Sequence, residues 1–196
     1  HAYKMSSICV VEPDAEKRAM LAEQFGVQTA THINDMPSSA PQVLVLAVKP
    51  QQMQAVCAQL NEKLSAQLKE HLIISIAAGI RTKDLGRWLN GHQAVVRAMP
   101  NTPAQIQVGV SALYAMPSVN STQREQASSI LQAVGSSLWL DNEEKMDAVT
   151  AISGSVVTSA MKSVPTKLLD SPSSVASPAA ASGSHWTLLR WRRGVG

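Results

Sequence analysis

Two charged residues directly follow apolar, β-branched segments, in positions where a strand would end and a ligand could bind. Glu12 follows residues 7–11, and a carboxylate there can accept hydrogen bonds from the hydroxyl groups of an adenosine ribose. Lys49 follows the apolar run that ends at Val48, and Pro50 after it restricts the turn and directs the lysine into a crevice. A capping or solvated glutamate and an ordinary exposed lysine are the simpler interpretations, and both remain open.

Three small residues follow a third apolar run, residues 72–77. Ala77, Ala78 and Gly79 would let a flat ring or a pyrophosphate approach the backbone closely. A tight packing corner between strand and helix would favour the same residues, so this segment alone does not decide between ligand binding and packing.

Hydrogen-bonding side chains follow a fourth apolar run, residues 94–99. Met99 ends the run, and Pro100 and Pro103 then bracket Asn101 and Thr102. Proline fixes the backbone φ angle, so the two polar residues have little freedom. Such a constrained pair is costly in a plain loop and indicates a binding role.

The elements that position these residues alternate in type along the chain. The patterns predict strands at 7–11, 43–48, 72–77 and 94–99, and helices at 15–25, 51–64 and 82–89. Asp14 can cap the first helix and Gly26 can end it. One helix between successive strands predicts an α/β fold with a Rossmann-like, mainly parallel sheet flanked by helices. In such a sheet, ligands bind at the carboxyl ends of the strands.

The remaining sequence divides into an extension of the sheet and an irregular tail. Short strands are predicted at 111–115 and 137–140 around a helix at 122–134, and a last helix should begin at Asn142, with Glu143 and Glu144 in its first turn. Residues 156–196 contain eight serines and three prolines without apolar periodicity. We therefore expect a partial dinucleotide-binding domain over 1–155 and a disordered or non-native tail over 156–196.

Composition indicates a globular chain in a reducing compartment. Of its 196 residues, 45% are hydrophobic, yet no apolar run approaches membrane-spanning length and no leader opens the chain. The formal net charge is +3, but residues 156–196 carry five basic side chains and one acidic, and residues 1–155 carry 12 basic and 13 acidic. Cys9 and Cys57 are far apart and show no metal-ligand spacing. We expect a soluble, cytoplasmic protein that binds no metal, membrane or nucleic acid.

Four ordered segments resemble the motifs of pyrroline-5-carboxylate reductases. They are Val45-Leu-Ala-Val-Lys-Pro50, Ile74-Ser-Ile-Ala-Ala-Gly79, Val96-Arg-Ala-Met-Pro-Asn-Thr-Pro103 and Asp147-Ala-Val-Thr-Ala-Ile-Ser-Gly-Ser155. The resemblance covers about residues 6–155, and the third segment is the most specific. It implies an oxidoreductase of proline biosynthesis that reduces 1-pyrroline-5-carboxylate to L-proline with NADPH or NADH in a homo-oligomer.

The resemblance also implies a set of site residues. Besides Glu12, the cofactor would be lined by Asn34, Val48, Lys49, Pro50, Ala77, Ala78 and Gly79. Met99, Pro100, Asn101, Thr102 and Pro103 would lie near the nicotinamide and the substrate. No catalytic residue is assigned. Glu12 favours NADH, because a carboxylate would repel the 2′-phosphate of NADPH, whereas Lys17 and Arg18 on the following helix could turn toward such a phosphate.

The chain departs from the family pattern at both ends. It begins at His1 without the first strand and glycine-rich loop, and after Ser155 it does not continue into the helical dimerisation domain. We therefore expect an incomplete chain that is inactive alone and whose tail arises from a reading-frame change or an assembly error. A non-catalytic remnant and another Rossmann-type reductase are the alternatives.

Overall fold

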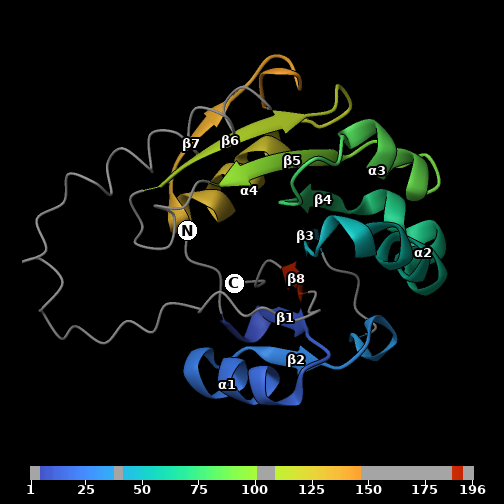
Figure 1. The fold of residues 1–196 in the computed structure, drawn as a ribbon, viewed down its shortest axis with the longest axis vertical. Helices are drawn as coiled ribbons and strands as arrows, with labels where there is room; N and C mark the ends of the chain where they lie inside the picture. The colour runs from blue at the N-terminus through green and yellow to red at the C-terminus, as the bar shows by residue number, and fades with distance from the viewer. Residues whose placement is uncertain (1–4, 38–41, 101–108, 147–186, 192–196) are drawn as a thin grey trace, which may run out of the picture.

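The computed structural model describes residues 5–37, 42–100, 109–146 and 187–191. Within them, one eight-stranded sheet has the order β2-β1-β8-β3-β4-β5-β6-β7 (Figure 1). The strands are β1 (Ile8–Val11), β2 (Gln28–Ala30), β3 (Val43–Ala47), β4 (Leu72–Ser75), β5 (Val95–Pro100), β6 (Gly109–Ala115), β7 (Gly135–Trp139) and β8 (Thr187–Trp191). The α-helices are α1 (Ala15–Phe25), α2 (Met53–Leu64), α3 (Thr82–Trp88) and α4 (Ser121–Leu131).

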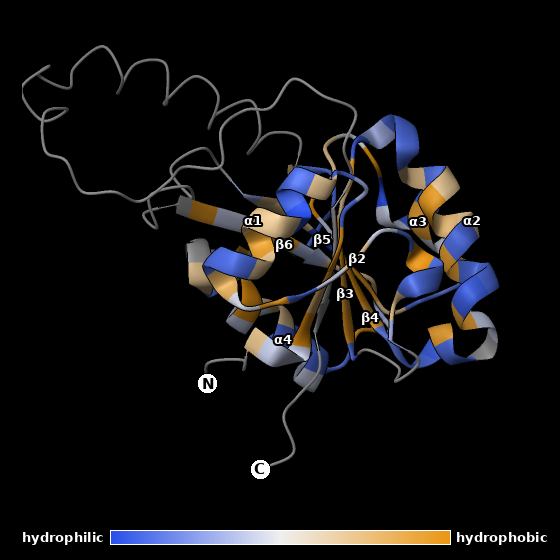
Figure 2. Ribbon diagram, turned by 90° about the horizontal axis from the view of Figure 1, so that it is seen from below, coloured by the Kyte–Doolittle hydropathy of each residue, from blue (hydrophilic) through white to orange (hydrophobic). Residues whose placement is uncertain are grey.

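The sheet is mainly parallel and has helices on both faces, which confirms the predicted Rossmann-like α/β fold. The pairs β1–β2, β3–β4, β4–β5 and β6–β7 are parallel, and β5–β6 is antiparallel. Figure 2 shows α2 and α3 on one side of the strands and α1 and α4 on the other. The carboxyl ends of β3, β4 and β5 therefore meet at one edge of the sheet.

The ends of α1 follow the predicted signals. Asp14 accepts hydrogen bonds through Oδ1 from the backbone N–H groups of Glu16, at 3.0 Å, and Lys17, at 3.1 Å. Gly26 ends the helix with φ +63° and donates its N–H to the carbonyl oxygen of Ala22 at 2.9 Å. Both ends are thus determined by local chemistry that the sequence displays.

Other boundaries differ from the predictions. The short strand β2 was not predicted, and β4 ends at Ser75 rather than residue 77. Residues 50–52 form a 3-10 turn because Gln52 donates its N–H to the carbonyl oxygen of Lys49, so α2 begins only at Met53. After α4, residues 132–134 also form a 3-10 turn. Asn142 accepts a hydrogen bond from the backbone N–H of Glu144 at 2.9 Å, as a cap would, but residues beyond 146 lie outside the described part.

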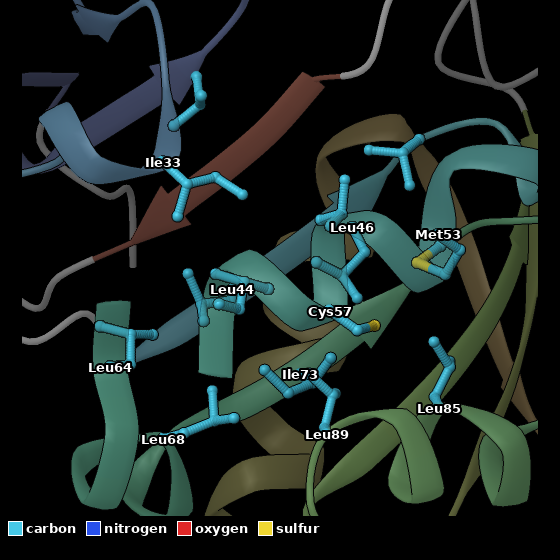
Figure 3. Packing of buried hydrophobic residues seen from close by; sticks show 14 of the residues in the cluster. Ile33, Leu44, Leu46, Met53, Cys57, Leu64, Leu68, Ile73, Leu85 and Leu89 are labelled. Atoms are coloured by element: carbon cyan, nitrogen blue, oxygen red, sulfur yellow. The ribbon is translucent and has the colours of Figure 1, made fainter. Parts of the chain in front are cut away.

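Two apolar clusters, one on each face of the sheet, pack the helices against the strands. The first joins β3 and β4 to α2 and α3, and Figure 3 shows Leu44, Met53, Cys57 and Leu89 packed in it. The second joins the opposite face to α4. Cys57 is free, and burial raises the pKa of its thiol to about 12, so it is an unreactive core residue.

The C-terminal segment contributes a strand to the centre of this sheet. β8 pairs antiparallel with β1 on one side and with β3 on the other. The prediction of an irregular tail is wrong for these five residues. The physical reason is long-range: the facing edges of β1 and β3 need backbone partners, and sequence periodicity does not show such a requirement. Residues 156–186 and 192–196 lie outside the described part. No helix among the described residues is long and apolar enough to cross a membrane.

Candidate functional site

Three of the predicted site residues lie at the carboxyl edge of the sheet, one at or just beyond the end of each of three neighbouring strands. The register aligns Leu46 of β3, Ser75 of β4 and Arg97 of β5 across the three strands. Val48, Ala77 and Met99 each lie two residues beyond this line, at the same edge. Ile76 continues the pairing past the end of β4, because its N–H donates to the carbonyl oxygen of Leu46 at 3.1 Å.

Glu12 lies immediately after β1 and is 2% exposed, so it is not a solvated surface glutamate. Its Oε1 accepts a hydrogen bond from the backbone N–H of Asp14 at 3.0 Å, while Asp14 itself caps α1. Nη1 of Arg18 donates to the backbone carbonyl oxygens of Glu12 and Pro13, both at 2.7 Å. The Arg18 guanidinium is therefore hydrogen-bonded to the turn after β1.

Val48, Lys49 and Pro50 connect β3 to α2. Val48 is buried, whereas Lys49 and Pro50 are exposed. Lys49 precedes the 3-10 turn with φ −62° and ψ 144°, the extended backbone expected before proline. The lysine thus lies exposed at the same edge as Ala77 and Gly79, at the start of the helical segment.

Ala77, Ala78 and Gly79 follow β4, and Gly79 adopts φ +74°. A Cβ atom at Gly79 would meet no heavy atom within 4 Å. This excludes a tight packing corner as the reason for glycine at this position. The left-handed backbone requires it, and the space in front of the backbone is open.

Asn34 lies in the 3-10 turn of residues 33–35, which follows β2. It is exposed, and its backbone carbonyl oxygen accepts a hydrogen bond from Nζ of Lys63 at 2.8 Å. That contact links the turn to α2. Lys63 is in the last turn of α2, so this contact does not bring Asn34 to the carboxyl edge.

Met99 and Pro100 form the end of β5 and are half-buried. Pro100 pairs with Ser111 of β6, and Ser111 is 1% exposed. Asn101, Thr102 and Pro103 lie outside the described residues. Met99 and Pro100 therefore mark where the predicted substrate segment begins.

A buried ion pair between β5 and the turn at Glu143 was not predicted. Arg97 is 1% exposed, and its Nη1 lies 3.4 Å from Oε1 of Glu143. Glu143 also accepts hydrogen bonds from the backbone N–H of Thr82 at 2.8 Å and from its hydroxyl at 2.9 Å. Glu143 was expected in the first turn of a helix that begins at Asn142; in the structure it lies in a turn just before helical residues 145–146, and its carboxylate joins β5 to the start of α3. An arginine within the apolar run of β5 was the sequence signal for a buried partner.

The opposite, amino edge of the sheet carries a buried histidine. His92 is 3% exposed, and burial lowers its pKa from the ordinary 6.5 because the charged imidazolium is poorly solvated there. It lies away from the predicted site residues. Among the described residues, no cluster of three or more His, Cys, Asp or Glu side chains could hold a metal ion.

A mainly parallel sheet with helices on both faces, and with small, charged and polar residues after its strands, defines a Rossmann-like domain of the kind found in nicotinamide-dependent oxidoreductases. Comparison with known proteins identifies the family within this class. Residues 2–79 match the family model described as NADP oxidoreductase coenzyme F420-dependent. A curated relative, pyrroline-5-carboxylate reductase from Pseudomonas aeruginosa, is 48% identical over 144 residues, which are 74% of this chain and 51% of that protein.

Solved structures agree with this relationship. A pyrroline-5-carboxylate reductase from Coxiella burnetii is 35% identical with a TM-score of 0.71, over 79% of this chain and 57% of that one. The Plasmodium falciparum pyrroline carboxylate reductase, solved with NADP bound, is 27% identical with a TM-score of 0.58, over 69% of this chain and 49% of that one. The chain belongs to the pyrroline-5-carboxylate reductase family. It spans about half the length of the curated relatives it matches.

Proposed function

We propose that the protein reduces 1-pyrroline-5-carboxylate to L-proline with NADPH or NADH, as an enzyme of proline biosynthesis in the cytoplasm. The observation that carries this proposal is the meeting of Val48, Ala77 and Met99, each from a different family motif, at one edge of the sheet. In a parallel α/β sheet this edge is the ligand-binding edge. Family membership supplies the reaction.

The cofactor would be held along this edge. Gly79 offers open space in front of its backbone, which suits the close approach of a ring or phosphate. Glu12 has the acceptor chemistry for ribose hydroxyl groups. Lys49 and Pro50 are exposed at the same edge and would line the cofactor together with Val48, Ala77 and Ala78. The family resemblance adds Asn34, which is also exposed. The acceptor group of Glu12 and the open backbone at Gly79 thus suit the nucleoside and nicotinamide parts of the cofactor.

When bound, the nicotinamide supplies the hydride for the reduction. The protein's own part is to orient the reactants, since the imine of the substrate is readily protonated and needs little acid–base help. Met99 and Pro100 would form one wall of the substrate position at the end of β5. Because a buried carboxyl group, Glu12, follows β1 and Arg18 is bound to backbone carbonyl oxygens, we expect the edge to favour the free 2′-hydroxyl of NADH over a 2′-phosphate.

One observation favours a second candidate, a non-catalytic relative of the enzyme. β8 runs antiparallel to β1 and β3, so its carboxyl end lies at the amino edge of the sheet. A parallel strand in this place would lead into a helix whose N-terminus could bind the pyrophosphate, and β8 does not supply one. This arrangement would weaken cofactor binding without changing the nucleoside end.

A turnover assay separates the two candidates. The purified chain is mixed with 1-pyrroline-5-carboxylate and either NADH or NADPH, and loss of reduced nicotinamide is followed together with formation of L-proline. Substrate-dependent oxidation that yields proline supports the reductase. Cofactor binding without proline formation at any enzyme concentration supports the non-catalytic relative. A preference for NADPH would contradict the role given to Glu12.

A further inference from the structure

The carboxylate of Glu143 joins two segments that lie behind the carboxyl edge of the sheet. Its Oε1 accepts a hydrogen bond from the backbone N–H of Thr82 at 2.8 Å and lies 3.4 Å from Nη1 of Arg97. Its Oε2 accepts a hydrogen bond from the Thr82 hydroxyl at 2.9 Å. Arg97 and Thr82 are buried, and the Glu143 side chain is only 15% exposed. Solvent and salt therefore screen these contacts little.

Both joined segments lead directly to predicted ligand positions. Arg97 precedes Met99 by two residues of β5, which is about 7 Å along a strand. Thr82 begins α3 and follows Gly79 by three residues. Glu143 belongs to neither element and lies in a turn that follows β7. Its carboxylate therefore connects the end of β5 to the segment that follows β4.

The start of α3 has no cap from its own segment. Arg81 occupies the N-cap position and makes no side-chain capping hydrogen bond. A serine, threonine or aspartate at this position usually binds free N–H groups of the first turn. Here the carboxylate of Glu143, 61 positions away in the sequence, binds the N–H of Thr82 instead. The start of α3 is thus held relative to β5, and not by its local sequence alone.

The buried ion pair suits a geometric role better than a purely stabilising one. The removal of two charges from water offsets much of their attraction, and well-packed apolar residues often stabilise a protein equally well. The pair does require one arrangement, because Glu143 must reach Arg97 while it also binds Thr82. The contact therefore fixes the position of the end of β5 relative to the start of α3.

We propose that Glu143 is a positioning residue for the reduction, an inference that rests on the proposed function. Through its two partners it sets the spacing between residues 77–79, which would line the cofactor, and Met99, which would border the substrate. Reacting atoms need to lie about 3–3.5 Å apart, and a misplacement of about 1 Å can lower a rate about 100-fold. Loss of the carboxylate should therefore lower kcat while the cofactor and the imine still bind.

Steady-state turnover of the full chain separates positioning from stabilisation, with each variant shown to be folded by circular dichroism. In Glu143→Gln, kcat with 1-pyrroline-5-carboxylate and NADH should fall about tenfold or more, while both KM values change less than about threefold. Glu144→Gln is the matched control, because Glu144 is the exposed neighbour, and it should leave all constants unchanged. Gly91→Ala introduces strain at φ +81° near the opposite edge and should leave kcat unchanged.

Substitutions at Thr82 test the other arm of the contact and leave the ion pair in place. Thr82→Val removes the hydroxyl that donates to Oε2 of Glu143, whereas Thr82→Ser keeps it. We expect kcat to fall about threefold or more in Thr82→Val and to stay near its original value in Thr82→Ser. These two variants carry the test even where Glu143→Gln does not fold.

The contrary results are distinct. A kcat of Glu143→Gln within about twofold of the unaltered chain, or an equal fall in Gly91→Ala, would overturn the positioning role. Equal kcat values in Thr82→Val and Thr82→Ser, or a rise in KM without a fall in kcat, would overturn it as well. If the unaltered chain forms no proline with either cofactor, the proposed function itself is refuted, and the inference falls with it.

Discussion

Gly79 gives a sharp test of the open space at the carboxyl edge. The substitution Gly79→Ala places a methyl group in front of a backbone with φ +74°, where no atom of the described residues lies within 4 Å. The unfolding free energy should therefore fall only by the cost of placing alanine in a left-handed backbone conformation, about 1–2 kcal/mol. If the cofactor occupies this space, the methyl group also overlaps it, at a cost of about 1–3 kcal/mol, which is roughly a 5- to 150-fold increase in Kd.

Gly91 is the matched control. It has φ +81°, a Cβ atom there would also meet nothing within 4 Å, and it precedes β5 at the opposite edge of the sheet. Gly91→Ala should therefore lower the unfolding free energy by a similar amount without changing cofactor affinity. Urea unfolding and calorimetric titration with NADH and NADPH measure the two quantities. Equal affinities of both variants for the cofactor would refute the reasoning.

Three further predictions concern stability. Glu143→Gln weakens the bonds to Arg97 and Thr82 and removes a negative charge beside a buried guanidinium, so the unfolding free energy should fall by about 1.5–3 kcal/mol; a loss below about 0.5 kcal/mol in urea unfolding would contradict this. His92 has a lowered pKa in the folded protein, so the unfolded state binds the proton more tightly; its contribution to stability is complete above pH 6.5 and is lost as the pH falls below it. Unfolding measured from pH 8 down to pH 5 should show this loss, and it should be smaller in His92→Gln. Asp14→Ala removes the cap of α1 and should cost about 1 kcal/mol, whereas Asp14→Asn, which keeps the acceptor oxygen, should cost much less in thermal unfolding.

The local parts of the fold could be predicted because their signals lie within a few residues. Asp14 and Gly26 mark both ends of α1, and the apolar run of β3 shows a strand buried on both faces. The grouping of Val48, Ala77 and Met99 followed from the rule that parallel strands end at one edge.

The parts that could not be predicted depend on contacts between distant residues. Glu143 reaches Thr82 across 61 positions of sequence, and no local pattern distinguishes it from a glutamate in a first helical turn. β8 forms because two distant strands present facing edges, although its own sequence contains an arginine. The reason for glycine at residue 79 also required the structure, since the backbone angle, and not close packing, decides it.

Amide chemical-shift mapping tests the central claim, that the carboxyl edge of this sheet binds a nicotinamide dinucleotide. The isotopically labelled chain is titrated with NADH and, separately, with NADPH. We predict that the shifts cluster at residues 12, 48–49 and 77–79 and that Gly91 and His92, near the amino edge, do not respond. No shift at saturating cofactor, or shifts centred on Gly91 and His92, would contradict the assignment of the site.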